Sequence, residues 1–302
     1  ITRGVPMDIK QLRYFVTVAN EKQITRAAQK LCMAQPPLSR QIIELEKEIG
    51  KTLFIRTKYE MELTAAGRRL LQKAQDIIFQ VDDLKYYVND ETPEKLSGVL
   101  KIGALMSCAP IFAQYLNIFS LIHPQVTYKL YEDTPANLLN LMYKREIELI
   151  FLRTPTFRAK QLTVVPLATE SFSLAVPARL DPCPFKDNIT LQEIAPLPLI
   201  MLHDGDNIGY NELFISAFAT LDIKPNIICQ CPNSSLALIL VFSGLGATIM
   251  PQKLLQWFPN DSTHIKKITG LVPDTKPVML FDSKRYLSPI AKQFLETMKN
   301  NI

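Results

Sequence analysis

Apolar positions near the start of the chain recur every three or four residues, which is the spacing of one helical face. Met7 to Asn20 carries this pattern first, and residues 26–31 repeat it more briefly, with Thr25 as the expected N-cap. A third helix is expected from Pro36 to about Ile49, because proline is accepted in a first turn and Gly50 is suited to end the helix. Two short helices joined by a tight turn predict a helix-turn-helix.

After this third helix the pattern changes to two short strands and then to one long helix. Residues 52–56 and 61–63 are expected strands around a polar, basic tip, which predicts a wing. Thr64 then caps a helix that reaches about Val88. Apolar residues alternate along this helix in steps of four and three: Leu70, Ala74, Ile77, Val81, Leu84 and Val88. Such a seam predicts a coiled coil and hence a dimerisation helix, although an amphipathic helix packed on its own domain has the same seam.

Beyond a polar linker at residues 93–97, strand and helix patterns alternate in the order βαβαβ and then repeat. Strands are expected at residues 99–104, 126–131, 148–152, 199–202, 227–230, 247–250 and 278–281. Helices are expected at residues 110–122, 136–144, 209–221, 234–243 and 289–299. This alternation predicts an α/β fold in two lobes, with parallel sheets and helices on their faces.

The positive charge of the chain is concentrated near its start. Residues 7–73 contain thirteen Lys and Arg against seven Asp and Glu, whereas residues 74–302 contain twenty against twenty-two. A basic head on a slightly acidic body suggests that the head meets a polyanion such as DNA. A basic surface that is merely solvated is the alternative.

The remaining composition argues against several classes of protein. The longest uninterrupted apolar stretch, Leu236 to Phe242, is far too short for a membrane span, and no secretory signal pattern is present. We therefore expect a cytoplasmic protein without membrane association. The five cysteines are expected as free thiols, with those of Cys229 and Cys231 pointing to opposite faces of a strand. The histidines lie far apart without companion ligands, so no metal ion and no cofactor is expected.

Several short motifs at the start of the chain resemble the head of LysR-type transcriptional regulators nearly position by position. They are Leu12-Arg-Tyr-Phe15, Thr25-Arg-Ala-Ala28, Ala34-Gln-Pro-Pro-Leu-Ser-Arg-Gln41, Leu45-Glu46, Leu53-Phe54 and Leu63-Thr64-Ala-Ala-Gly67. The body carries shorter runs similar to those of the same family: Leu130-Tyr-Glu132, Glu146 to Arg153 and Ser243-Gly-Leu-Gly-Ala247. At motif level the similarity covers about Met7 to Val88.

The resemblance implies an N-terminal winged helix-turn-helix, a long dimerisation helix and a two-lobed effector domain of periplasmic-binding-protein architecture. We expect the DNA-binding domain at residues 7–65, the dimerisation helix at 66–92 and the effector domain at 93–302. Lobe I is expected from about 98–166 with 271–302, and lobe II from about 167–270. The family usually assembles as a tetramer, with body-to-body contacts between dimers.

Side chains at the start of the third helix should enter the major groove, where amides and guanidinium groups read base edges. The candidates there are Gln35, Ser39, Arg40 and Gln41. The resemblance implies the same use for the first three of these positions. Thr25, at a helix N-terminus, suits a phosphate contact. In the wing, Arg56 and Lys58 are expected to contact phosphates or the minor groove, and a solvated hairpin is the alternative.

In a two-lobed fold of this kind a ligand lies between the lobes, at the carboxyl ends of strands and beside helix N-termini. This geometry favours anions and small polar metabolites. Residues that follow the expected strands should meet the crevice: Ser107, Cys108, Thr134, Pro135, Arg153, His203, Asp204, Asn233 and Ser234. Ser234 is also suited to be only an N-cap, and Arg153 is equally suited to a structural ion pair with a neighbouring Glu.

An enzyme and a pure ligand-binding or transport protein are the alternative classes. The sequence has no G-x-S-x-G, G-x-x-x-x-G-K, H-E-x-x-H or complete G-x-G-x-x-G motif, and a transport receptor has no use for a helix-turn-helix. We therefore predict a sequence-specific transcriptional regulator, not an enzyme, that is switched by a small polar, anionic metabolite. Its expected partners are double-stranded promoter DNA, the effector, RNA polymerase and further copies of the chain in a homodimer or homotetramer.

Overall fold

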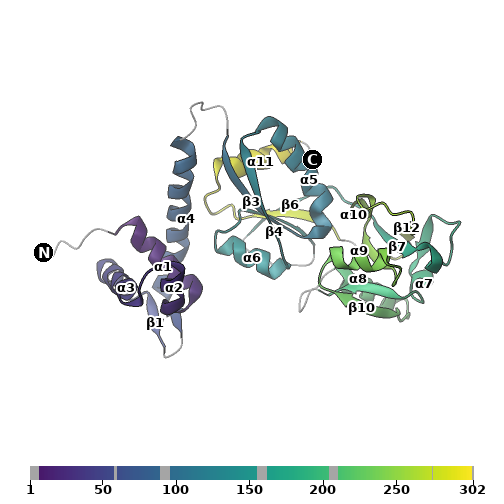
Figure 1. The fold of residues 1–302 in the computed structure, drawn as a ribbon, viewed down its shortest axis with the longest axis horizontal. Coiled ribbons are helices and arrows are strands. Elements are labelled where there is room, and N and C mark those ends of the chain that lie inside the picture. Colours follow the sequence, from purple (N-terminus) through teal and green to yellow (C-terminus); the bar gives the residue numbers. More distant parts are fainter. Residues whose placement is uncertain are drawn as a thin grey trace. The chain divides into compact units, whose positions relative to one another are not determined.

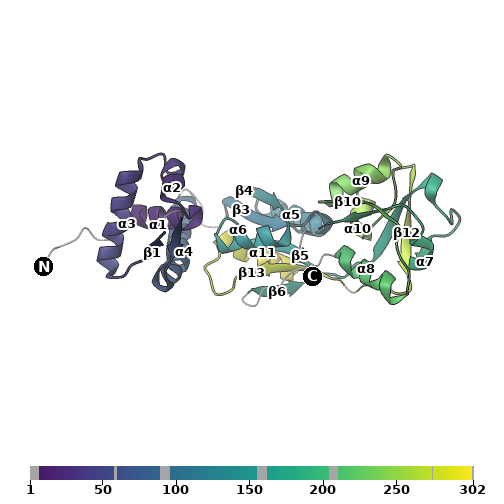
Figure 2. The same ribbon diagram turned by 90° about the horizontal axis from the view of Figure 1, so that it is seen from below.

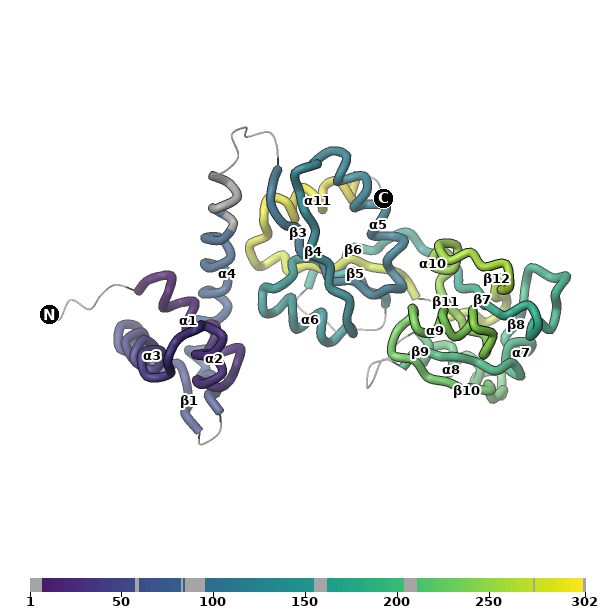
Figure 3. Tube along the Cα trace, in the orientation of Figure 1, coloured from purple at the N-terminus to yellow at the C-terminus, as the bar shows by residue number. Residues whose placement is uncertain are grey.

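The chain divides into two units, Ile1–Glu94 and Lys95–Ile302, in the computed structural model (Figure 1). Each unit is described by itself. The structure describes residues 7–57, 60–88, 96–154, 162–203, 210–273 and 275–300, without the side chains of residues 83, 85–88 and 210. Figure 3 follows the Cα trace through both units.

The first unit begins with three helices, and local capping marks the start of the first and the end of the third. They are α1 (Ile9–Glu21), α2 (Ile24–Lys30) and α3 (Gln35–Ile49). Asp8 caps α1 by accepting a hydrogen bond from the backbone N–H of Gln11 at 2.7 Å. Gly50 ends α3 in the left-handed conformation at a φ of 70°, as expected from the sequence. Figures 1 and 2 both show α3 on the side of α1 away from the long helix α4 (Ala65–Val88).

A two-stranded wing follows α3. β1 (Phe54–Arg56) pairs antiparallel with β2 (Met61–Leu63). The first strand starts two residues later than expected. At its start, the backbone N–H groups of Leu53 and Phe54 donate to the carboxylate of Glu46 at 2.7 and 3.1 Å, which ties the strand to α3. Thr64 then caps α4, as predicted, by accepting from the N–H of Gly67 at 3.0 Å.

One apolar core holds the helices and the wing of this unit together. Phe15 of α1 stacks on Phe54 of the wing with ring centroids 5.3 Å apart, and both rings are buried. Leu38 and Ile42 fix α3 in this core, so the orientation of its polar face is determined by buried residues. Each fully buried side chain of this size stabilises the fold by roughly 1.5–3 kcal/mol through area removed from water.

The second unit contains two sheets, and the first of them forms lobe I. Its strand order is β4-β3-β5-β13-β6. The strands are β3 (Gly98–Ala104), β4 (Val126–Glu132), β5 (Leu149–Arg153), β6 (Thr163–Pro166) and β13 (Pro277–Phe281). The helices are η1 (Met106–Cys108), α5 (Ala109–Ile122), α6 (Pro135–Tyr143) and α11 (Pro289–Lys299). Phe119 of α5 and Phe294 of α11 meet at 5.2 Å within the core of this lobe, whereas α6 contributes Leu138 to a separate cluster.

Lobe II is built on a four-stranded sheet of order β11-β7-β12-β8 and a pair β10-β9. Its strands are β7 (Phe172–Pro177), β8 (Asn188–Thr190), β9 (Leu199–Leu202), β10 (Ile227–Cys231), β11 (Thr248–Pro251) and β12 (Thr263–Thr269). Its helices are η2 (Ala178–Leu180), α7 (Leu191–Ile194), α8 (Tyr210–Thr220), α9 (Ser234–Phe242) and α10 (Gln252–Gln256). The N–H of Ile200 donates to the carbonyl of Ala247 at 2.8 Å, which joins β9 to the start of β11 and makes the two sheets nearly continuous.

The expectation of parallel sheets is correct in part. β3 pairs parallel with β4 and with β5, and β9 pairs parallel with β10. β13 instead pairs antiparallel with β5 and β6, and β7 pairs antiparallel with β11 and β12. Each of these antiparallel pairs contains one strand, β7 or β13, that enters its sheet from the other lobe, so the direction of that strand depends on the connections between the lobes.

The expectation for the two neighbouring cysteines is wrong. The sulfur atoms of Cys229 and Cys231 lie 3.8 Å apart on the same face of β10. Residues two apart on a strand share a face, so this pairing follows from the strand period itself. Burial raises the pKa of the Cys231 thiol to about 11, and the described cysteines are free thiols.

A search of the described helices finds none that is long and apolar enough to cross a membrane.

Candidate functional site

The start of α3 presents polar side chains on an exposed surface. Gln35 and Arg40 are exposed, and Ser39 is half-buried. The amide of Gln41 donates to the carboxylate of Glu44 at 2.8 Å along the same helix. The predicted DNA-reading residues are therefore all at least partly accessible around the N-terminal part of α3, while its apolar side lies in the core.

Thr25 does not cap α2 as expected. The helix begins two residues earlier than expected, at Ile24, and its N-cap is Gln23, whose side chain makes no capping hydrogen bond. Thr25 is consequently the second residue of the helix and is exposed. Its hydroxyl and the first N–H groups of α2 remain accessible to a phosphate.

The described part of the wing leaves Arg56 exposed at the end of β1. The tip is closed by Thr57, whose hydroxyl accepts from the N–H of Glu60 at 2.9 Å. Lys58 lies outside the described residues. Arg56 is therefore an exposed basic residue beside a closed turn.

The predicted seam of α4 is divided between two environments. Ala74 is fully buried in the core of its own unit, and Leu70 packs against that core. Ile77 and Leu84 are 40% and 57% exposed. α1 packs along α4, and an ion pair between Arg13 and Asp82 also joins the two helices, whereas Ile77 and Leu84 lie outside the core of this unit.

The seam is thus not one continuous dimer surface, which corrects the sequence interpretation. Its first half serves intramolecular packing, which was the alternative. Its second half offers exposed apolar residues with Val81 half-buried beside them. The side chain of Val88 lies outside the described residues.

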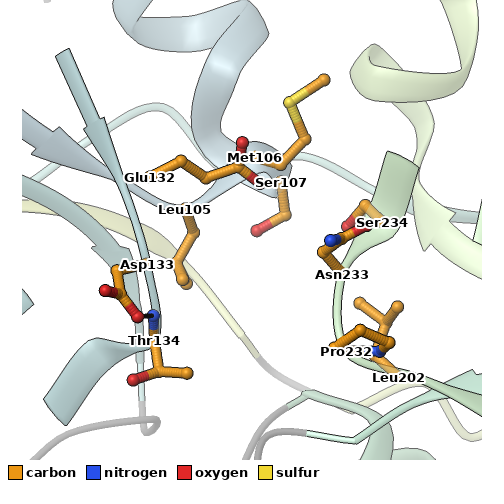
Figure 4. A pocket seen from close by; sticks show the side chains of 10 residues that line it. All are labelled: Leu105, Met106, Ser107, Glu132, Asp133, Thr134, Leu202, Pro232, Asn233 and Ser234. Atoms are coloured by element: carbon orange, nitrogen blue, oxygen red, sulfur yellow. Dashed lines mark hydrogen bonds between the residues drawn. The ribbon is translucent and has the colours of Figure 1, made fainter. Parts of the chain in front are cut away.

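A cavity of about 370 Å³ lies between the two lobes of the second unit. Figure 4 shows the residues that line it, which come from the loop after β3, the end of β4 and the ends of β9 and β10. They are Leu105, Met106, Ser107, Glu132, Asp133, Thr134, Leu202, Pro232, Asn233 and Ser234. The carboxyl ends of parallel strands and the starts of helices meet here, which is where α/β folds bind ligands.

Two of the predicted crevice residues cap helices at the cavity. Thr134 caps α6 by accepting from the N–H of Asn137 at 3.4 Å, and Asn233 caps α9 by accepting from the N–H of Leu236 at 2.9 Å. Ser234 is therefore the first residue of α9 and not its cap. Ser107 and Ser234 are 4% and 3% exposed, and Figure 4 shows the Ser107 hydroxyl pointing into the space between the lobes.

Arg153 does not line the cavity. It forms a structural ion pair with a Glu, which was the alternative considered from the sequence. The side chain is fully buried, pairs with the buried carboxylate of Glu170 and lies 5.5 Å from the ring centroid of Phe172. The guanidinium also donates to the carbonyl of Ser107 at 3.1 Å. Its charge is thus neutralised by Glu170 inside the protein rather than offered to a ligand.

Cys108 and Pro135 also lie beside the cavity without lining it. The thiol of Cys108 is buried and donates to the carbonyl of Leu152 at 3.4 Å, and burial raises its pKa to about 11. Pro135 is buried in the first turn of α6. His203 is exposed and does not line the cavity. Its backbone N–H donates to the backbone carbonyl of Cys231 at 2.7 Å. Asp204 lies outside the described residues.

Sequence reasoning missed six lining residues, two of which are carboxylates. Asp133 accepts from the N–H of Thr134 and from the side-chain amide of Asn137, both at 2.7 Å, so it helps to start α6. Glu132 is exposed at the end of β4. Their position at the carboxyl end of a parallel strand was the available signal. Across the described ranges, no three His, Cys, Asp or Glu side chains come together as a metal site would require.

Comparisons with known proteins cover nearly the whole chain. Residues 9–68 match the model of bacterial regulatory helix-turn-helix proteins of the lysR family, and residues 93–302 match the LysR substrate binding domain. HTH-type transcriptional regulator BsdA of Bacillus subtilis (strain 168) is 34% identical over 96% of this chain and 99% of its own length. HTH-type transcriptional regulator AlsR of the same organism is 29% identical over 96% of this chain and 94% of its own length.

Solved structures share the fold. Full-length CbnR, crystallised with its target DNA, is similar with a TM-score of 0.66 and 23% identity over 98% of this chain and all of its own length. A full-length OxyR variant from Pseudomonas aeruginosa is similar with a TM-score of 0.68 and 24% identity over 98% of this chain and 94% of its own. Helix-turn-helix, wing, long helix and two-lobed body thus occur in the predicted order, and the relatives are regulators rather than enzymes. The chain belongs to the LysR family of bacterial DNA-binding transcriptional regulators, with a helix-turn-helix domain and an effector-binding domain.

Proposed function

We propose that a small polar metabolite, bound in the cavity between the two lobes, switches the binding of this regulator to promoter DNA. The observation that carries the proposal is the convergence of two buried serines and the start of α9 on a cavity of about 370 Å³. The N–H groups of Ser234 and Ser235 are at the first two positions of α9, where a helix has no internal acceptor for them. An anionic group of the ligand is received there.

The proposed effector site comprises the predicted residues that line the cavity: Ser107, Thr134, Asn233 and Ser234. Arg153 acts on it indirectly, by holding the carbonyl of Ser107. Ligand and DNA affinities are reciprocally linked, because a ligand shifts a conformational balance only as far as it prefers one state.

The proposed DNA-reading residues are those of the exposed α3 surface: Gln35, Ser39, Arg40 and Gln41. Thr25, Arg56 and Lys58 supply phosphate or minor-groove contacts. The domain limits follow the sequence interpretation, with DNA binding at 7–65, dimerisation at 66–92 and effector binding at 93–302.

The protein acts as a cytoplasmic homodimer or homotetramer and meets RNA polymerase at the promoter. A symmetric dimer places two recognition helices about one helical turn of DNA, roughly 34 Å, apart. The operator is therefore an interrupted palindrome of roughly 15 base pairs or more.

A gel shift with promoter fragments at several salt concentrations tests DNA binding. Arg40→Ala is expected to weaken specific binding by about 1–3 kcal/mol if Arg40 reads a base. Lys47→Ala, on an exposed position later in α3, is the matched control. Equal affinity of the wild-type and Arg40→Ala proteins for the specific site would refute the assignment.

Calorimetry of the full chain against organic acids and amino acids tests effector binding. Ser234→Leu fills the cavity at the start of α9 and is expected to abolish binding of any acid that the wild type takes up. A ligand bound equally by wild type and Ser234→Leu occupies another place, and the proposed site is then wrong.

A further inference from the structure

The charge of the cavity is unusual for a site that receives an anion. Its described lining includes the carboxylates of Glu132 and Asp133 and no Lys, Arg or His. The buried cation nearby, Arg153, is paired with Glu170. Positive potential in the described cavity therefore comes from helix N-termini, each equivalent to roughly half an elementary charge.

The two sides of the cavity offer different partners to a ligand. On the lobe II side, the first N–H groups of α9 and the buried hydroxyl of Ser234 can donate hydrogen bonds. On the lobe I side, Asp133 is occupied by the start of α6. Glu132 accepts no hydrogen bond from any described residue that the structure records, and Figure 4 shows its side chain extending inward toward Met106 and Ser107.

Apolar side chains from both lobes also line the cavity. Leu105 and Met106 come from lobe I, and Leu202 and Pro232 come from lobe II. A ligand that spans the cavity thus meets the donors of α9 on the lobe II side, apolar side chains from both lobes, and on the lobe I side the carboxylate of Glu132 together with the hydroxyls of Ser107 and Thr134. Only a molecule with a matching order of groups satisfies all three.

We infer that the effector is a monocarboxylate with a compact apolar middle and a hydroxyl or amino group at its far end, and that Glu132 selects this donor. The inference rests on the proposed function and narrows it. A second carboxylate at the far end would face Glu132 and be repelled, whereas a hydroxyl or ammonium group would donate to it. Two like charges a few ångströms apart near a protein surface change affinity by about tenfold or more.

The test compares acids that differ only at the end opposite the shared carboxylate. One series is benzoate, para-hydroxybenzoate, para-aminobenzoate and terephthalate, and a flexible series is butyrate, gamma-aminobutyrate and succinate. Binding to the full-length protein is measured by calorimetry for wild type and Glu132→Gln. Glu146→Gln removes the same charge from an exposed position of lobe I outside the cavity lining, and serves as the control.

In at least one series, we expect wild type and Glu146→Gln to bind the donor-bearing acid about tenfold more tightly than the dicarboxylate. Glu132→Gln should narrow this preference to threefold or less. Its amide removes the repulsion without closing the cavity.

Three results would overturn the inference, and they are distinguishable. If the acids bind, and binding is lost in Ser234→Leu, but Glu132→Gln keeps the wild-type order of affinities, the selection by Glu132 is wrong while the proposed site stands. If the dicarboxylate is the tightest wild-type ligand, the donor requirement is wrong. If no acid binds at millimolar concentration, or binding survives in Ser234→Leu, the proposed function fails together with the inference.

Discussion

Replacing Arg153 should destabilise the effector unit strongly, because the residue belongs to a fully buried ion pair. Arg153 and Glu170 have side-chain exposures of 0% and 2%. Arg153→Met keeps much of the side-chain volume but leaves the carboxylate of Glu170 without its cation. Breaking a buried pair from one side costs about 3–5 kcal/mol.

The reciprocal change Glu170→Leu leaves the buried guanidinium unpaired and should cost a similar amount. The double variant Arg153→Met with Glu170→Leu removes both charges. The double variant should therefore lose far less unfolding free energy than the two single variants lose together. An apolar pair of similar volume is often no less stable than a buried ion pair.

Urea unfolding followed by the fluorescence of Trp257, the single tryptophan of the chain, measures the free energy of unfolding of each variant. Trp257 and Glu170 belong to lobe II, whereas Arg153 belongs to lobe I. Arg179→Met, at an exposed arginine of the same lobe, is the control and should lose less than about 1 kcal/mol. A loss below about 1 kcal/mol for Arg153→Met contradicts the reasoning. If that stable variant also failed to bind effector acids, Arg153 would be restored as a ligand residue.

Three further changes probe other parts of the chain. Gly67→Ala should destabilise the first unit by about 1–3 kcal/mol in thermal unfolding, because the new Cβ would lie 2.2 Å from the carbonyl oxygen of Leu53. An unchanged midpoint temperature of unfolding contradicts this close approach. Ile77→Asp with Leu84→Asp places charges on the exposed half of α4 and should shift light scattering toward monomers, and an unchanged mass excludes that surface from the dimer. Hydrogen bonds from the backbone and the hydroxyl of Thr190 lower the pKa of Glu193 to about 2, so the stabilising effect of this carboxylate is present at neutral pH and is lost as the pH falls from about 4.5 through 2. Glu193→Gln should therefore flatten the dependence of unfolding free energy on pH in that window. Identical pH profiles of the two proteins would argue against the effect.

Features that depend on neighbours in the chain were predictable from the sequence. Thr64 caps α4 and Gly50 ends α3 because each acts on the adjacent turn. The terminal helix Pro289–Lys299 was predicted with its observed bounds, since its apolar face has a clear helical period and Ser288 caps it. The lobes were recognisable from the alternation of strands and helices.

Features that depend on distant partners were not predictable in the same way. β8 is three residues long and exists through its pairing with β12, and neither strand has a strong period of its own. Arg153 stands at the end of a strand, as several lining residues do. It does not line the cavity because its side chain is buried in an ion pair with Glu170, a partner that is distant in the sequence. The apolar seam of α4 was predicted from the sequence. Which of its residues are buried within the unit and which are exposed depends on the packing of α1 against α4.

The position of β13 has a consequence for how the protein is made. Residues 277–280 pair with residues 150–153 near the centre of the lobe I sheet, and α11 then covers its core. During synthesis, the strands of lobe II leave the ribosome before the last strand of lobe I exists. Lobe II can therefore fold while lobe I still exposes an unpaired edge at β5, a state that invites aggregation until the C-terminal segment arrives. Slow translation of that last segment would prolong the exposed state, and chaperone dependence should concentrate in lobe I.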